Sequence, residues 1–178
     1  MTNYLVNLVN LSSRTIFPNM GNFLTTNQII KQGVAVINSN KIQGFVLFTQ
    51  KESHVSIHVE VKGLTPNHKH GFHIHESGDL REGCKSCCAH YNPTNTTHGG
   101  LEGGHSGDLG NIKTDSKGNC NITMQTDKFT VNEILGRSII IHEDEDDLGK
   151  GNFDDSHTTG HSGARIACAV IGISKDCK

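Results

Sequence analysis

Three histidines occur within the seven residues of the segment HGFHIHE, residues 70–76. The segment alternates as a β-strand does, and successive side chains of a strand point to opposite faces. His73 and His75 are therefore expected to project from the same face toward one point. Two imidazole nitrogens that converge in this way are suited to bind a metal ion.

Five further residues have the types and positions that metal ligands require. They lie in long Gly-rich intervals or at the end of a strand: His90, His98, His105, Asp108 and His142. Three imidazoles and one carboxylate, from residues 90–108, form a four-coordinate nitrogen and oxygen set that suits zinc and would order an irregular loop. The imidazoles of His73, His75 and His142 come from strands and form an all-nitrogen set, which favours copper.

Each of these residues has an ordinary explanation when it is taken alone. An isolated His-X-His on a strand is usually an exposed pair, and a loop histidine is usually solvated. An aspartate beside a glycine is more often a turn residue than a ligand. Seven such residues, all at strand ends or in Gly-rich intervals, are hard to explain separately, so the set predicts metal binding.

Eight segments with a period of two residues could position these side chains. They are rich in Val, Ile and Phe, and turn sequences lie between or beside them: residues 33–38, 44–50, 54–61, 70–76, 109–115, 120–125, 137–143 and 166–173. No long helical pattern competes, which predicts an all-β, eight-stranded antiparallel sandwich or barrel. The intervals 77–108 and 143–165 are too long for hairpins, so we expect functional loops there.

The composition predicts one soluble domain with an N-terminal extension. The chain has 178 residues, 34% hydrophobic residues and 20 glycines, and no apolar run long enough to cross a membrane. A net charge of -2 argues against a general nucleic-acid or anionic-lipid surface. Residues 1–31 contain no Asp or Glu and lack the pattern of a secretory signal. We therefore expect a flexible extension at 1–31, a domain at 32–178 and a cytosolic location.

The six cysteines are too few for a disulfide scaffold in a chain of this length. Cys84, Cys87 and Cys88 form the segment CKSCC, which alone fits a redox Cys-X-X-Cys motif or half of a zinc ribbon. The second half of a ribbon is missing, so a cysteine-only zinc site is not expected.

Seven segments, in order across residues 33–174, together resemble the copper/zinc superoxide dismutase family. They are HGFHIHESGD, GC at 83–84, AHYNP, HGG at 98–100, HSGDLGN, GRSIIIHEDEDDLGKG and GARIACAVIGI. The resemblance implies the family's fold, an antiparallel Greek-key sandwich of the immunoglobulin-like kind. It also implies conversion of two superoxide anions and two protons to dioxygen and hydrogen peroxide, with a copper ion that cycles and a zinc ion that is structural.

The resemblance implies a role for each matching residue. The copper ligands would be His73, His75, His90 and His142, and the zinc ligands would be His90, His98, His105 and Asp108. His90 would bridge the two ions and deliver a proton, and Arg165 would receive the anion over the copper. His70 would hold the strand and loop by hydrogen bonding, and Asp146 would link non-bridging ligands of the two metals. Cys84 and Cys168 would form a disulfide, with Cys87 or Cys88 as competitors for Cys168.

The resemblance also implies partners and reveals one departure. Superoxide would be the substrate, and a copper chaperone would be a further partner. Residues 33–37, 135–137 and 170–173 correspond to regions through which family members form homodimers. Two positions that often carry steering lysines in the family are Asp144 and Thr158 here, which leaves Arg165 and, less directly, Lys150 as cations. We therefore expect weak electrostatic steering of superoxide.

Two alternatives to a dismutase can be distinguished from it. A dismutase-like copper chaperone would lack some copper ligands and would add a cysteine-based delivery motif, whereas residues 1–31 contain no cysteine. A non-catalytic metal-binding sandwich would bind metals without turnover, whereas Arg165 beside an open copper position predicts turnover.

Overall fold

The structure, a computed structural model, describes residues 30–39 and 41–175, so residues 1–29 of the expected extension and Cys177 lie outside it. Within these ranges the chain forms ten strands, two one-turn α-helices and one 3-10 turn. Their bounds are β1 (Gln32–Asn38), β2 (Gln43–Gln50), β3 (Val55–Lys62), β4 (Lys69–His75), β5 (Arg81–Cys84), η1 (Lys85–Cys87), β6 (Asp108–Lys113), β7 (Cys120–Thr126), α1 (Val131–Ile134), β8 (Ser138–His142), α2 (Ser156–Thr159), β9 (Arg165–Val170) and β10 (Gly172–Ile173).

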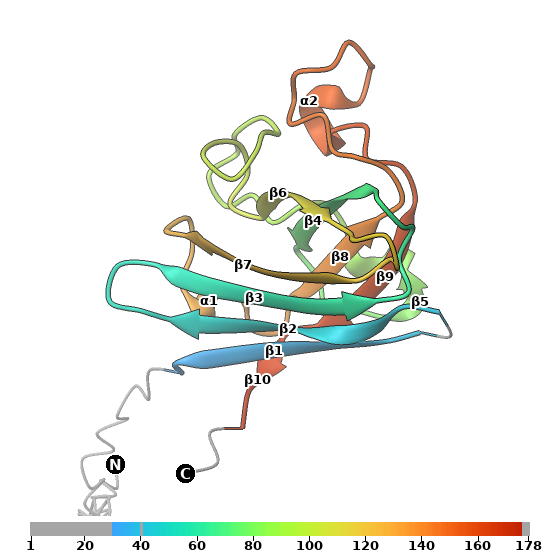
Figure 1. The fold of residues 1–178 in the computed structure, drawn as a ribbon. Helices are drawn as coiled ribbons and strands as arrows, with labels where there is room; N and C mark the ends of the chain where they lie inside the picture. Colours follow the sequence, from blue (N-terminus) through green and yellow to red (C-terminus); the bar gives the residue numbers. More distant parts are fainter. Residues whose placement is uncertain (1–29, 40, 176–178) are drawn as a thin grey trace, which may run out of the picture.

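The strands form two antiparallel sheets that lie in separate layers (Figure 1). One sheet has the order β10-β1-β2-β3-β7, and the other has the order β6-β4-β8-β9. β7 pairs with β3 and β8 pairs with β4, and pairing between strands distant in the chain is a feature of Greek-key topology. The predicted all-β antiparallel sandwich is confirmed.

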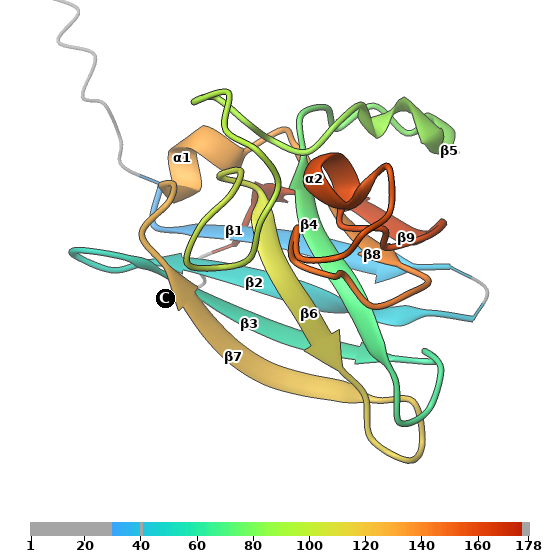
Figure 2. The ribbon, with the colours of Figure 1, turned by 90° about the horizontal axis from the view of Figure 1, so that it is seen from above.

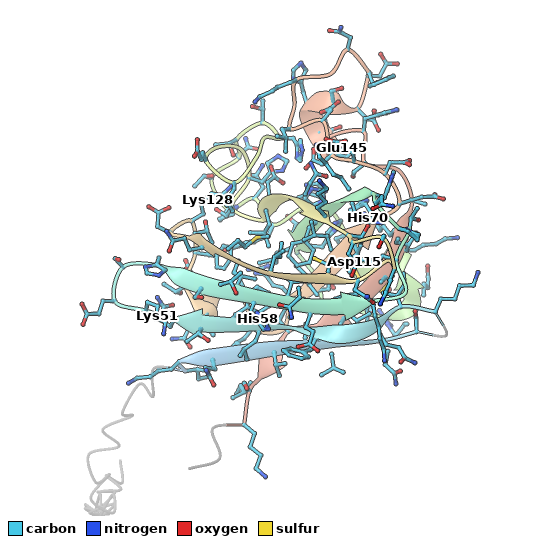
Figure 3. All side chains as sticks on the ribbon, in the orientation of Figure 1. Lys51, His58, His70, Asp115, Lys128 and Glu145 are labelled. Atoms are coloured by element: carbon cyan, nitrogen blue, oxygen red, sulfur yellow. A yellow bond between two sulfur atoms is a disulfide. The ribbon has the colours of Figure 1, made fainter. Side chains whose placement is uncertain are left out.

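Alternation along the strands places one face of each sheet in the core. In β3, Val55, Ile57, Val59 and Val61 are buried, and the residues between them are more exposed. Side chains of both sheets fill the space between the layers (Figure 3). β4 differs because it is buried at six of its seven positions. This strand lies between β6 and β8 and is covered on both faces, which explains its near-continuous burial.

The structure departs from the predicted elements at the last strand. Residues 166–173 form β9 and β10, which belong to different sheets, rather than one strand. The break is at Ile171, whose N–H donates to the Arg137 carbonyl oxygen and whose carbonyl oxygen accepts from Gly136 N–H. These bonds lead the chain across to β1, where Ile173 lies opposite Gly33.

The two long loops cover the outer face of the four-stranded sheet (Figures 1 and 2). The first connects β4 to β6 and carries β5 and η1, and the second connects β8 to β9 and carries α2. A disulfide between Cys84 and Cys168, with Cα atoms 5.6 Å apart, ties the first loop to β9. The expected pairing is thus confirmed, and Cys87 and Cys88 are free. Among the described residues, no helix has the length and apolarity that a membrane crossing requires.

Candidate metal centre

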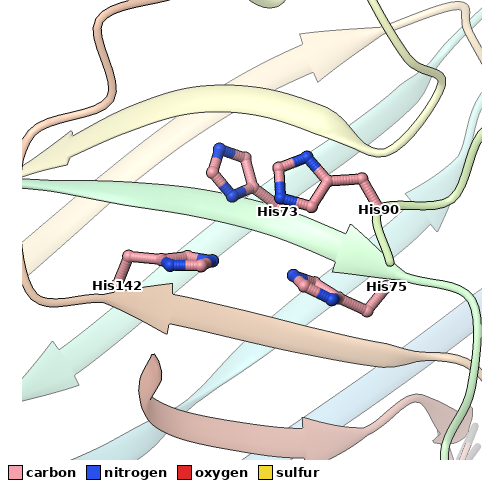
Figure 4. Close-up of side chains that lie close together, drawn as sticks. All are labelled: His73, His75, His90 and His142. Carbon is pink, nitrogen blue, oxygen red and sulfur yellow. The ribbon is translucent and has the colours of Figure 1, made fainter. Parts of the chain in front are cut away.

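Four buried histidines face one another above the four-stranded sheet (Figure 4). We refer to His73, His75, His90 and His142 as the four-histidine cluster, because one nitrogen of each lies within 4.8 Å of the others. His73 and His75 project from β4, and His142 ends β8. His90 comes from the first long loop and is held beside β4 by an isolated bridge to His75. Three of the four side chains therefore have a rigid β-strand base.

Hydrogen bonds fix which ring nitrogen faces the centre of this cluster. His75 donates from Nδ1 to the Cys88 carbonyl oxygen at 2.9 Å, and His142 donates from Nδ1 to the Gly163 carbonyl oxygen at 3.2 Å. In both rings Nε2 is buried and has no hydrogen-bond partner among the described residues. Metal-binding histidines in proteins have this arrangement, in which the second nitrogen is held by a carbonyl or carboxylate.

A second cluster shares His90 and adds three residues from the end of the first loop. We refer to His90, His98, His105 and Asp108 as the His/Asp cluster. Asp108 Oδ1 lies 2.8 Å from His90 Nδ1 and 3.2 Å from His105 Nδ1, and Asp108 Oδ2 lies 3.0 Å from His98 Nδ1. Asp108 is the first residue of β6 rather than a loop residue, so this strand anchors the carboxylate.

His90 is the residue that the two clusters share. Its Nδ1 faces Asp108, and its Nε2 is buried without a hydrogen-bond partner in the described part of the chain. The two nitrogens of one ring therefore face different clusters.

Asp146, in the second loop, connects the two clusters by a different route. Its Oδ2 lies 2.7 Å from His73 Nε2, and its Oδ1 lies 2.8 Å from His98 Nε2. Asn111 on β6 fixes the Asp146 backbone, because its side chain donates to the Asp146 carbonyl oxygen and accepts from the Asp146 N–H, both at 2.8 Å. Gly160 lies behind the carboxylate with φ 70°, and a Cβ atom there would overlap Asp146 Oδ1.

His70 is buried on β4 outside both clusters. Its Nδ1 donates to the carbonyl oxygen of His142 at 2.7 Å. This bond joins β4 to the end of β8, where the second loop begins.

Burial determines the protonation of the four-histidine cluster. Burial, with a smaller contribution from nearby His90, lowers the pKa of His75 to about 2 and that of His142 to about 4. The pKa of His73 is also far below its usual value, first because of burial and then because of His90. These imidazoles are neutral at pH 7, which is the form that binds metals.

In the His/Asp cluster, burial also lowers the pKa of His105, but the pKa of His98 is shifted in the opposite direction. Burial lowers the pKa of His98, but hydrogen bonds with Asp108 and Asp146 outweigh it and raise this pKa to about 9. Burial raises the pKa of Asp108, but hydrogen bonds with His90 and His98 outweigh it and hold this pKa well below its usual range. The cluster therefore holds a proton that a metal ion would displace.

The donor atoms of both clusters fit metal ions. Five buried ring nitrogens have no polar partner among the described residues: His70 Nε2, His73 Nδ1, His75 Nε2, His90 Nε2 and His142 Nε2. All but the first belong to the four-histidine cluster, and buried polar atoms without partners are costly in free energy. Four imidazole nitrogens suit copper, and three nitrogens with one carboxylate suit zinc.

A cavity of about 550 Å³ gives access to His90. Arg165 lines this cavity, and its guanidinium donates to the carbonyl oxygens of Cys84 at 2.8 Å and Cys88 at 2.7 Å. Thr158 also lines the cavity, whereas Lys150 and Asp144 do not. Among the lining residues, Arg165 is the permanent cation. Glu76 also lines the cavity, so the attraction for a small anion comes from the position of Arg165 near His75 and His142 rather than from the net charge of the wall.

Sequence reasoning missed Asn111, the Cys88 carbonyl and Gly160. Asn111 has one signal, since it is a polar side chain within the apolar pattern of β6. Cys88 acts through its backbone, so its residue type gives no indication of its contacts.

Comparisons with known proteins agree with this geometry. The family model described as copper/zinc superoxide dismutase matches residues 42–171. The chain is 46% identical over 140 residues to superoxide dismutase [Cu-Zn] of Paramecium bursaria Chlorella virus 1. The aligned region covers 76% of this chain and 75% of the relative. It is 48% identical over 143 residues to extracellular superoxide dismutase [Cu-Zn] of Drosophila melanogaster, and this aligned region covers 76% of this chain and 78% of the relative.

A solved structure gives a further comparison. The crystal structure of the clock protein EA4 superposes with a TM-score of 0.80 at 38% identity, covering 82% of this chain and 96% of that one. The fold, the family model and the sequence relatives agree, and the chain belongs to the copper/zinc superoxide dismutase family.

Proposed function

We propose that the protein is a superoxide dismutase that holds copper at the four-histidine cluster and zinc at the His/Asp cluster. The position of His90 carries this proposal, because its two ring nitrogens face different clusters. A histidine that binds metals through both nitrogens must lose its ring proton, and two cations stabilise that charge. The chemistry that bound copper supplies is one-electron exchange, through which two superoxide anions and two protons become dioxygen and hydrogen peroxide.

Arg165 attracts and orients the substrate in this proposal. Its guanidinium is always charged, and two carbonyl oxygens from the first loop hold it at the cavity wall. A cation fixed before the substrate arrives stabilises an anion without reorganising. Arg165→Gln should therefore lower kcat/KM and weaken anion inhibition, while both metals stay bound.

His90 carries a proton in this proposal. Its ring lines the cavity, and its Nε2 has no partner among the described residues. Whenever this atom is not bound to copper, it would bind a proton and release it to the reduced product, while Nδ1 stays beside Asp108, 2.8 Å away. Asp146 holds His73 and His98, whose ring centroids lie 4.2 Å and 5.3 Å from that of His90, so the groups beside the His90 ring are fixed.

A dismutase assay on protein reconstituted with both metals tests the activity. Wild-type protein should catalyse superoxide loss, and His75→Ala should lose copper and activity while it keeps zinc. Metal binding without turnover in the wild-type protein would favour a non-catalytic metal-binding sandwich. Full activity after addition of copper salt alone would remove the need for a copper chaperone.

We also propose a homodimer formed through β1, β9 and β10. Large apolar side chains are exposed there: Val36 by 64%, Ile173 by 66% and Val170 by 39%. β10 pairs with β1, so Ile173 and Val36 belong to neighbouring strands of one sheet. Exposed apolar surface of this kind suits a subunit interface. Sedimentation should show a dimer that Val36→Lys with Ile173→Lys dissociates, and a wild-type monomer would contradict the proposal.

The cytosol is the proposed location. Cys88 is an exposed free thiol, which suits a reducing compartment. The fly relative is named as extracellular, so secretion is the alternative that the experiment must address. Tagged protein should stay with the cells, and its recovery from the medium would contradict a cytosolic location.

A further inference from the structure

Lys128 lies outside both clusters, in the turn between β7 and α1, and its side chain reaches the first long loop (Figure 3). Nζ donates to the carbonyl oxygens of Gly100 at 2.9 Å, Gly103 at 2.8 Å and Asp108 at 3.0 Å. A lysine ammonium has three N–H donors, so these three carbonyl oxygens satisfy all of them. The contact is therefore a complete cage of backbone acceptors, unlike an ion pair at the surface.

The base of the Lys128 side chain is anchored to the five-stranded sheet. Its backbone N–H donates to the hydroxyl of Thr126, the last residue of β7, at 3.3 Å. The next residue, Phe129, is buried in the core. The ammonium thus connects the first loop to the end of the five-stranded sheet, which contributes no residue to either cluster.

The segment that Lys128 holds needs an external support. Four of the six residues 99–104 are glycine, and glycine has the largest backbone freedom to lose on ordering. This segment leads directly to His105 and Asp108, and Asp108 is itself one of the three acceptors. A loose segment would separate the side chains of the His/Asp cluster before an ion could bind them.

We propose that Lys128 is a positioning residue that holds residues 100–108 in the zinc-binding arrangement before zinc arrives. The inference rests on the proposed assignment of zinc to the His/Asp cluster. The ammonium also repels a cation, but the three carbonyl dipoles and the Asp108 carboxylate offset its charge. Ordering of the loop therefore outweighs repulsion, and loss of the ammonium weakens zinc binding.

The test compares Lys128→Met, which keeps a long side chain without the ammonium, with Lys117→Met. Lys117 is exposed in the β6–β7 turn, so this control removes the same charge away from the loop. Competition with a chromophoric chelator should show zinc affinity lowered by about 10- to 100-fold in Lys128→Met, as for other residues that orient metal ligands. Lys117→Met should stay within about 2-fold of wild type, a range expected for a charge this exposed.

Hydrogen exchange of the metal-free proteins gives a readout that does not need zinc. Amides of residues 99–108 should exchange faster in Lys128→Met than in wild type, and amides of β1 to β3 should be unchanged. Equal or tighter zinc binding in Lys128→Met would overturn the inference. Faster exchange throughout the five-stranded sheet would also overturn it, because Lys128 would then stabilise the whole fold.

Two outcomes need a second measurement: a Lys128→Met variant that does not fold, and a wild-type protein that binds no zinc. If Lys128→Met does not fold, Lys128→Gln replaces it, because an amide NH2 has two N–H donors and cannot satisfy three carbonyl oxygens. Unchanged zinc affinity in the glutamine variant would then overturn the inference. If wild-type protein binds no zinc, the proposed function fails, and the exchange comparison still decides the role of Lys128.

Discussion

The guanidinium of Arg165 donates a hydrogen bond of 2.7 Å to the carbonyl oxygen of Cys88. The same oxygen accepts a hydrogen bond from His75 Nδ1 at 2.9 Å, so one peptide group orients both the cavity cation and a member of the four-histidine cluster. Cys88 presents this oxygen with φ 64° and ψ -150°, a backbone region that is essentially restricted to glycine. Backbone strain is thus stored where two functional contacts meet.

Replacement of Cys88 by glycine should stabilise the protein. Relief of this strain should raise the free energy of unfolding by about 1 kcal/mol, after the greater freedom of glycine in the unfolded chain is subtracted. Urea denaturation of the disulfide-bonded protein measures the change. Cys88→Ala keeps a Cβ atom and should give no gain, so an equal gain in both variants would contradict the explanation by strain.

Replacement of Asp146 by asparagine should weaken both metal sites. The carboxylate accepts from His73 and His98 together, whereas an amide presents an NH2 group to one of them. We expect affinities for copper and zinc to fall by about 10- to 100-fold, measured as metal content after dialysis against a chelator. Asp154→Asn, at an exposed position in the same loop, is the control and should retain both metals.

A lysine at position 158 should increase the rate of substrate capture. Thr158 lines the cavity where Arg165 is the permanent cation, so a second positive charge would strengthen the local field. In Thr158→Lys we expect kcat/KM to rise by up to about 10-fold at low ionic strength, and salt should reduce the gain. Thr158→Gln supplies length without charge. No gain in the lysine variant would refute weak steering as a property of this chain, and Asp144→Lys tests the other position.

The metal-free protein should lose stability as the pH falls below neutrality. The pKa is about 2 for His75 and about 4 for His142, below the unfolded value of about 6.5. Between pH 6.5 and 4 the unfolded chain therefore binds protons that the folded chain does not. The free energy of unfolding should fall with pH in this window by up to about 1.4 kcal/mol per pH unit for each group.

The pKa of about 9 for His98 acts in the opposite direction. Its contribution is fully present below pH 6.5 and is lost as the pH rises through 9, so stability should be greatest near neutral pH. Urea denaturation of metal-free protein between pH 4.5 and 9.5 measures both the acid limb and the alkaline limb of the plot of unfolding free energy against pH. His142→Gln should flatten the acid limb and His54→Gln should not, and an acid limb unchanged by His142→Gln would contradict the assignment.

Most strands could be predicted from the sequence because their buried apolar residues alternate with more exposed ones. The sequence pattern does not predict β5, because its residues Arg81–Cys84 are mostly exposed and show no such alternation. Val55, Ile57, Val59 and Val61 alternate with more exposed residues, and the observed β3 follows that pattern. The apolar residues of the segment 166–173 continue through Ile171, so the sequence pattern predicts one strand there. Its division into β9 and β10 depends on hydrogen bonds with Arg137 and Gly136, which local periodicity cannot reveal.

The metal-binding residues could be predicted because histidine is uncommon and its spacing is informative. The residues that orient them were harder to predict, since they act through backbone atoms or from distant segments. Lys128 lies 20 residues beyond Asp108 and contacts carbonyl oxygens, so no motif marks it. Cys88 has a backbone conformation that its residue type disfavours, and only the assembled loop explains it.

Gly160 contributes no side chain to either cluster, yet it limits how this metal centre can evolve. Its missing side chain leaves room for the carboxylate of Asp146, and any larger residue would collide with both Asp146 Oδ1 and His98 Nε2. A single inherited change there would disturb two neighbouring ion sites at once, without altering any ligand. Surveys of natural variation in this chain should therefore find position 160 as invariant as the histidines themselves.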